Sequence, residues 1–226
     1  MDIAVLGTGM VGRALAGRLD GLGHTVVVGT RDPEATLART DSDRMGNPPY
    51  TVWAADHPGV RLATFADAAA GAELVVNASS GDVTLDVLTA AGADHLAGKT
   101  LLDIANALDF SQGFPPSLAV SNTDSLGEQV QRAFPEAKVV KTLNTLNATL
   151  MVEPKSLNQS STVFVSGDDA AAKATVVALL ESFGHDDVID LGGLETARGT
   201  EMLLPIWLRL MNALGTAEFN FKIVRV

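Results

Sequence analysis

Short apolar runs rich in β-branched residues alternate along this chain with stretches in which apolar residues recur every three or four positions. Runs of the first kind predict strands at 3–6, 25–28, 74–76, 101–104, 138–141, 163–165 and 188–191. Stretches of the second kind predict helices from 11 to about 21 and at 64–71, 82–92, 124–133, 168–183 and 195–214. Buried strands that alternate with amphipathic helices are typical of a parallel sheet covered by helices. The pattern therefore predicts an α/β fold with a doubly wound, largely parallel sheet.

The same pattern predicts one large domain and a small appendage. We expect residues 1–191 to form the α/β domain and residues 192–226 to form a C-terminal helical cap that completes a substrate pocket. Residues 40–59 are rich in Gly and Pro and have no clear periodicity, so we interpret them as a long surface excursion, with Tyr50 and Trp53 able to order it. The sequence assigns no role to this segment.

Charge and composition limit the kinds of partner that we expect for this 226-residue chain. It has 16 Lys and Arg against 27 Asp and Glu, which gives a formal net charge of −11. Nucleic acids and anionic membranes attract basic surfaces, so neither is expected as a partner. The chain has no cysteine, which excludes disulfides and a Cys nucleophile, and its four histidines are too scattered to predict a metal site. We find no signal peptide or membrane-spanning run, and we expect a soluble, cytoplasmic protein.

A glycine-rich turn carries the strongest chemical signal. It directly follows the first predicted strand, opens the first helix, and reads Gly7, Thr8, Gly9, Met10, Val11 and Gly12. In this setting Gly7 permits the tight turn, Gly9 lets a pyrophosphate approach the backbone, and Gly12 lets helix and strand pack closely. The helix start adds unpaired N–H groups and partial positive charge. The turn therefore predicts a Rossmann-type dinucleotide site.

The end of the second predicted strand indicates which dinucleotide is bound. NAD sites usually place a carboxylate there to bind the ribose hydroxyls, whereas this chain has Thr30 and Arg31. A hydroxyl and a guanidinium can receive a 2′-phosphate through charge-assisted bonds. We therefore predict NADP, and the alternative is an exposed Arg31 with Asp32 on the ribose of NAD.

Three small or amide residues after later strands are expected to line the cofactor path, because ligands of doubly wound sheets lie beyond the carboxyl ends of the strands. They are Ala78, Ser79 and Asn106. Asn106 can equally cap the loop that follows it.

Four segments occur here in an order that resembles a known family. They are G-T-G-M-V-G at 7–12, V-G-T-R at 28–31, V-V-K-T-L-N at 139–144 and V-S-G-D at 165–168. Together they resemble the NADP oxidoreductases that use the deazaflavin coenzyme F420, and the related cytoplasmic domains of the six-transmembrane epithelial ferric reductases. The resemblance covers nearly the whole chain, including R-G-T-E at 198–201 and Pro205.

This resemblance implies an NADP-dependent oxidoreductase whose C-terminal helices complete a pocket for a flavin-like ring over the nicotinamide. It also implies a homodimer, a small-molecule redox substrate, and coenzyme F420 or a flavin as the second substrate. Asn144 and Leu146 are then the expected residues at the site of hydride transfer, where they would contact the acceptor. The archaeal deazaflavin enzymes carry His at the position of Asn144, and the ferric reductase branch carries Asn.

Other readings stay open beside this one. Arg198 either faces a charge of the substrate or bonds a helix end. The apolar stripe around Trp207 is interpreted as core or dimer interface. The K-x-x-N spacing of Lys141 and Asn144 is set aside, because residues three apart in a strand point to opposite faces. Alternative functions are NADPH-dependent reduction of a carbonyl, an imine or a ferric chelate, and redox sensing without turnover.

Overall fold

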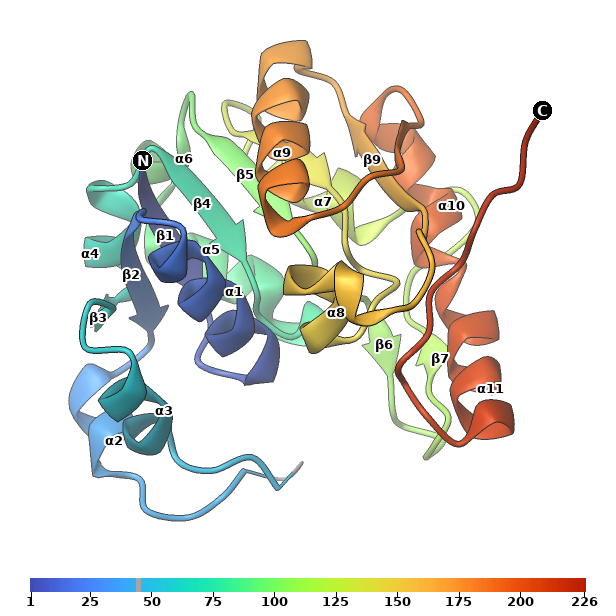
Figure 1. The fold of residues 1–226 in the computed structure, drawn as a ribbon. Coiled ribbons are helices and arrows are strands. Elements are labelled where there is room, and N and C mark those ends of the chain that lie inside the picture. Colours follow the sequence, from blue (N-terminus) through green and yellow to red (C-terminus); the bar gives the residue numbers. More distant parts are fainter. Residues whose placement is uncertain (44–45) are drawn as a thin grey trace.

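A single twisted sheet of eight strands forms the centre of the molecule in the computed structural model, which describes residues 1–43 and 46–226 (Figure 1). The strands are β1 Asp2–Leu6, β2 Thr25–Thr30, β3 Arg61–Thr64, β4 Leu74–Asn77, β5 Thr100–Asp103, β8 Lys138–Lys141, β9 Val163–Gly167 and β10 Val188–Asp190. Their order is β10-β9-β8-β5-β4-β1-β2-β3. Neighbouring strands run parallel, apart from the antiparallel pair of β8 and β9. The predicted fold class is confirmed.

Helices cover both faces of this sheet. They are α1 Met10–Gly21, α2 Pro33–Ala38, α3 Tyr50–Asp56, α4 Phe65–Ala70, α5 Thr84–Ala91, α6 Ala93–Leu96, α7 Leu126–Ala133, α8 Ala148–Val152, α9 Ala170–Phe183, α10 Ala197–Glu201 and α11 Leu204–Leu214. Short 3₁₀ turns lie at Gly81–Val83, Pro154–Ser156 and Leu194–Thr196, and β6 Leu108–Asp109 pairs with β7 Ser117–Leu118.

The alternating direction of side chains along β1 shows how the strands contribute to two separate cores. Ile3 and Val5 pack into one cluster with side chains of α1, α8 and α9, which lie in front of the sheet in Figure 1. Ala4 and Leu6 pack into a second cluster with side chains of α4, α5 and α7. Successive residues of a strand point to opposite faces, so one short apolar run feeds both cores.

The segment 40–59 is more regular than the sequence predicts. Its second half forms α3, whose Tyr50 is buried and lies under the Arg13 guanidinium, 5.7 Å from the ring centre. Trp53 stacks on His57 at the other end of this helix. The prediction of an irregular excursion is therefore wrong for 50–56, because aromatic contacts to α1 stabilise a helix that has no long apolar stripe. Residues 44–45 of the excursion lie outside the described part of the chain.

The long final helix predicted at 195–214 is also wrong in detail. A 3₁₀ turn, α10 and α11 follow one another, with a break at Met202 and Leu203. Pro205 stands in the first turn of α11, where its missing N–H costs no hydrogen bond. It could not continue a helix from α10 without breaking the hydrogen-bond ladder.

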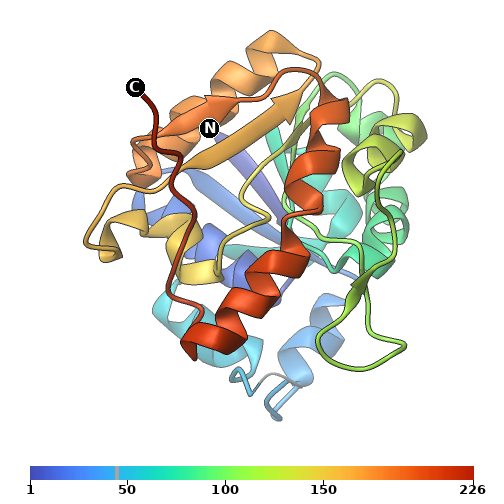
Figure 2. The same cartoon turned by 90° about the vertical axis from the view of Figure 1, so that its right-hand side faces the viewer.

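The last residues return along the molecule as an extended tail, which Figure 2 shows beside the residues that lead into β9. The Thr162 N–H donates to the Phe221 carbonyl, and Asp187 accepts from both Lys222 and Arg225. Trp207 of α11 stacks on Phe219 of the tail, with 5.3 Å between ring centres. The boundary predicted between residues 191 and 192 stays a prediction. No helix within the described ranges is long and apolar enough to cross a membrane.

Candidate functional site

The glycine turn after β1 leaves open space at one of its three glycines. Gly7 has a φ of +131°, and a Cβ there would lie 2.6 Å from the Ala78 carbonyl oxygen. A Cβ on Gly12 would overlap the Gly7 carbonyl. A Cβ on Gly9 would meet nothing within 4 Å. Packing therefore explains Gly7 and Gly12, whereas the space over Gly9 is available to a ligand.

The start of α1 supplies the electrostatics of this space. Gly9 caps the helix without a side-chain hydrogen bond, and the first turn carries no acidic residue. The Arg13 guanidinium donates to the Thr8 carbonyl at 2.8 Å and to the Pro48 carbonyl at 2.6 Å, which ties the turn to the segment before α3. Unpaired N–H groups and the positive end of the helix dipole favour an anion. The turn, with Thr8, Met10 and Val11, thus fits the pyrophosphate of a dinucleotide.

At the end of β2, the two predicted phosphate-binding residues have different environments. Thr30 is buried, and its hydroxyl lies 2.9 Å from the hydroxyl of Thr36. Since the Thr36 hydroxyl donates to the Asp32 carbonyl, the Thr30 hydroxyl must donate to Thr36. Arg31 is exposed and has no hydrogen bond or ion pair with any other residue that the structure describes.

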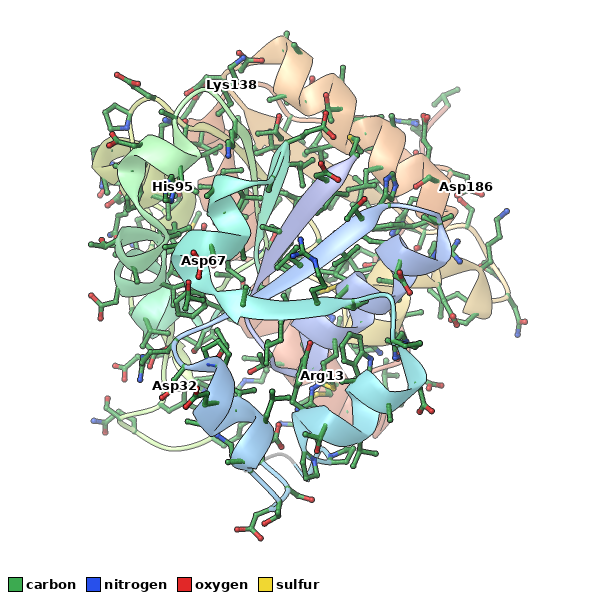
Figure 3. All side chains as sticks on the ribbon, turned by 90° about the vertical axis from the view of Figure 1, so that its left-hand side faces the viewer. Arg13, Asp32, Asp67, His95, Lys138 and Asp186 are labelled. Carbon is green, nitrogen blue, oxygen red and sulfur yellow. The ribbon has the colours of Figure 1, made fainter. Side chains whose placement is uncertain are left out.

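Asp32 has a structural task at the same place. Its side chain accepts from the Ala35 N–H at 2.9 Å and so caps α2. Figure 3 shows Asp32 at the start of α2 and Arg13 near α3. Between these helices and the glycine turn lies a cavity of about 230 Å³, lined among others by Thr8, Arg13, Thr36, Arg39 and Tyr50. The carboxylate of Asp32 is therefore engaged, while Arg31 and this cavity are open to a ligand.

Beyond the ends of β4 and β5, the expected lining residues form a bonded network. Ala78 packs against the glycine turn, and its N–H donates to the Leu6 carbonyl. The Ser79 hydroxyl donates to Asn77 Oδ1 at 2.6 Å, and Asn77 Nδ2 donates to Asp103 Oδ1 at 2.7 Å. Asn77 and Asp103 are fully buried. These contacts fix the backbone where a cofactor of a doubly wound sheet would lie.

Asn106 and Asn144, which the sequence places in separate segments, form a reciprocal pair. Asn106 Nδ2 donates to the Asn144 carbonyl at 2.9 Å, and Asn144 Nδ2 donates to Asn106 Oδ1 at 3.0 Å. Asn144 Nδ2 also donates to the Thr200 carbonyl of α10 at 3.0 Å. The preceding residue, Leu143, has a φ of +61°, a strained backbone for a bulky residue that helps to turn the chain here. We call these two side chains the amide pair.

Two further predicted residues are held by the protein itself. Leu146 is 6% exposed and packs in the core cluster that contains α8. Arg198 forms two hydrogen bonds with the carboxylate of Glu128, at 2.8 and 2.5 Å. These bonds lower the pKa of Glu128 and raise the pKa of Arg198. Glu128 lies in the first turn of α7 and also accepts from the Ser125 hydroxyl. Arg198 is thus paired at a helix start, and contact with a substrate stays a prediction.

Sequence reasoning missed a buried ion cluster next to the amide pair. Lys141 at the end of β8 is completely buried, with Nζ 2.8 Å from Asp103 Oδ2 and 2.9 Å from Glu201 Oε1. Burial opposes its charge, but the two carboxylates outweigh burial and raise the pKa of Lys141 above its usual value. The sequence argument against a joint role of Lys141 and Asn144 assumed that the strand continues through both residues. In the structure β8 ends at Lys141, and Leu143 turns the chain. The sequence signal that could have revealed the cluster is a lysine and an aspartate at the ends of two buried strands.

Comparison with known proteins adds independent findings. Residues 2–107 match the family model described as NADP oxidoreductase, coenzyme F420-dependent. The metalloreductase STEAP3 of Rattus norvegicus is 30% identical over 91% of this chain, and the chain spans 37% of that protein's length. The F420-dependent NADP reductase of Methanothermobacter thermautotrophicus is 29% identical over 93% of this chain and 89% of its own.

Solved structures agree with this result. A protein from Arthrobacter sp. FB24, for which F420-dependent NADP reductase activity has been proposed, is 65% identical, with both chains fully covered and a TM-score of 0.95. A reductive aminase from Aspergillus terreus in complex with NADPH is 18% identical, covers 94% of this chain and 62% of its own, and has a TM-score of 0.63, which shows a shared fold.

Proposed function

Because this chain belongs to the family of coenzyme F420-dependent NADP oxidoreductases, we propose that it transfers hydride between NADP(H) and a deazaflavin or flavin ring. Membership makes the chain an NADP-dependent oxidoreductase, and the acceptor is the proposed part. The acceptor is a separate small molecule in this proposal, and NADP(H) supplies or takes up the hydride when bound.

The observation that carries the proposal is the amide pair and its surroundings. Two amides bonded to each other and to backbone offer hydrogen bonds but no proton at neutral pH. The nearest buried cation, Lys141, has its donors directed at Asp103, Glu201 and the Ala105 carbonyl. Reduction of a carbonyl would need a proton donor at the substrate oxygen. Transfer between two rings depends mainly on holding them face to face without water, which the amide pair and Leu146 suit.

The nucleotide half of the proposal assigns roles to residues of the first two strands. The glycine turn binds the pyrophosphate with backbone N–H groups, and Ala78 and Ser79 form the wall that continues the path toward the amide pair. Arg31 binds the 2′-phosphate through a charge-assisted bond, beside the backbone of Thr30. The engagement of Asp32 in capping α2 supports NADP over NAD.

Steady-state kinetics with a panel of acceptors tests the proposal. NADPH oxidation is measured with coenzyme F420, FMN, riboflavin, a ferric chelate and a cyclic imine, each against NADH as the control. We expect turnover with a deazaflavin or flavin to exceed turnover with the imine and the chelate. Preference for the imine or the chelate would overturn the choice of acceptor. NADPH binding with no turnover of any acceptor would indicate a redox sensor instead.

The homodimer and the cap belong to the same proposal. Residues 192–226 would close the acceptor pocket, and α11 presents the exposed apolar side chains Ile206 and Leu214 to a second copy. Light scattering at micromolar concentration tests this: the wild type should be dimeric, and Ile206→Glu should shift it toward monomer. A monomeric wild type would contradict the proposal. The cytoplasmic location expected from the sequence stays a prediction.

A further inference from the structure

We propose that the ion cluster of Lys141, Asp103 and Glu201 positions the amide pair, which makes Lys141 and Glu201 positioning residues for the reaction. The kinetic part of this inference rests on the proposed function, and its structural part does not.

The contacts of Lys141 use every donor of its ammonium group. Nζ donates to Asp103 Oδ2 at 2.8 Å, lies 2.9 Å from Glu201 Oε1, and donates to the Ala105 carbonyl at 2.5 Å. An ammonium has three N–H groups and no acceptor, so this arrangement leaves no donor for a substrate. Lys141 therefore acts on the site through the protein groups that it holds.

Those groups lead to the amide pair from two sides. Ala105 immediately precedes Asn106, so the bond from Lys141 to the Ala105 carbonyl fixes the backbone that carries one amide. Thr200 immediately precedes Glu201, and its carbonyl accepts from Asn144 Nδ2. The contacts close into a ring that runs from Lys141 through Ala105, Asn106, Asn144, Thr200 and Glu201 back to Lys141.

Glu201 links this ring to a third element. Its two carboxylate oxygens accept from the N–H groups of Leu126 at 2.7 Å and Gly127 at 3.1 Å, at the start of α7. One side chain of α10 therefore holds the start of α7 and the end of β8 at once. Loss of its charge would loosen α10, and with it the carbonyl that orients Asn144.

The charge balance favours positioning over stability as the reason for this cluster. One ammonium between two carboxylates gives a formal net charge of −1, on side chains that are at most 4% exposed. Buried ion pairs often add nothing to stability relative to apolar side chains of similar size, because removing the charges from water is costly. What the cluster supplies is directional contact among β5, β8, α7 and α10.

Three variants and one control test the inference. Glu201→Gln keeps the shape and removes the charge, and Lys141→Met removes the ammonium. Lys141→Met leaves two carboxylates without their ammonium. The double variant Lys141→Met/Glu201→Gln leaves only the carboxylate of Asp103, so the formal charge of the cluster equals that of the wild type. Lys138→Met is the matched control, since it makes the same change on the same strand at a partly exposed ion pair with Asp169.

The readouts are crystal structures, NADPH affinity by fluorescence titration, thermal stability, and kcat per folded enzyme. In Glu201→Gln and the double variant we expect displacement of Asn144 from Thr200 and a kcat about 10- to 100-fold lower, since small misplacements at a reacting centre have effects of this size. NADPH affinity should change less than about 3-fold, because the glycine turn and Arg31 follow β1 and β2, whereas the cluster lies on β5, β8 and α10. The control should match the wild type.

The double variant separates positioning from stability. It should melt at a higher temperature than Lys141→Met, while its kcat stays low. Recovery of kcat together with stability would overturn the inference, and so would an unmoved amide pair in both Glu201→Gln and the double variant. A wild type without turnover on any acceptor would refute the proposed function, and the position of the amide pair in the variant structures would still decide this inference.

Discussion

Replacing Arg31 with alanine should remove most of the preference for NADPH over NADH. Arg31 is exposed at the end of β2 and has no partner among the described residues, so alanine leaves no group unpaired in the free protein. The Thr30 hydroxyl donates to Thr36 and has no proton left for a phosphate. Of the two predicted residues, Arg31 is therefore the one expected to carry the charge-assisted bond.

The size of the effect follows from the kind of bond that is lost. A hydrogen bond between charged groups contributes about 1.5–3 kcal/mol. Since about 1.4 kcal/mol is a factor of ten, NADPH affinity should fall about 10- to 150-fold. The guanidinium is exposed and screened by salt, so we expect the lower end near 0.15 M ionic strength. NADH lacks the 2′-phosphate, and its affinity should change less than about 2-fold.

Fluorescence titration of both nucleotides with the wild type and Arg31→Ala measures the difference. Arg61→Ala is the matched control, because it removes the same charge from an exposed residue at the start of β3, whereas Arg31 follows the far end of the parallel neighbour β2. Thr30→Val should change the NADPH/NADH ratio less than about 3-fold. Equal losses for NADPH and NADH in Arg31→Ala, or an equal loss of NADPH affinity in Arg61→Ala, would refute the reasoning.

Two further predictions concern the glycine turn and the tail. Gly9→Ala should leave the stability of the free protein within about 0.5 kcal/mol, since a Cβ there meets nothing, but should weaken NADPH at least about tenfold by filling the pyrophosphate space. Gly12→Ala should instead lower stability by about 1–3 kcal/mol through its overlap with the Gly7 carbonyl. Thermal melts of both variants with and without NADPH separate the two cases. Equal melting temperatures of the two free variants would contradict the prediction. Hydrogen bonds from Lys222 and Thr162 lower the pKa of Asp187 below its ordinary value of 3.8. A lowered folded-state pKa stabilises the protein above the unfolded value, and the contribution is lost as the pH falls through the folded value. Asp187→Asn should therefore be less stable than the wild type at pH 6, with a difference that narrows below pH 3.8; urea melts from pH 3 to 7 measure it, and a difference that stays constant would exclude this role.

The sequence by itself determined the nucleotide turn and seven of the eight strands of the central sheet, and it missed β3 at Arg61–Thr64. Each predicted strand is a short apolar run that can be recognised from its own residues. Each occurs in the structure with ends within a few residues of the predicted ones. The glycine turn is equally local, because its meaning depends on the strand before it and the helix after it. The predicted long helix at 195–214 failed at Met202 and Leu203, because Pro205 lacks the N–H that a continuous helix would need there.

Only the tertiary structure decided what the polar residues at the strand ends do. Lys141 and Asp103 become partners because β5 and β8 are neighbours in the sheet, although the two residues are 38 positions apart in the chain. Glu201 joins them from α10, and Asn144 meets Asn106 across the same edge. A lysine at the end of an apolar run is expected to be exposed unless its partners are known. Burial of a charge depends on groups that arrive from distant segments, and periodicity along one segment carries no information about them.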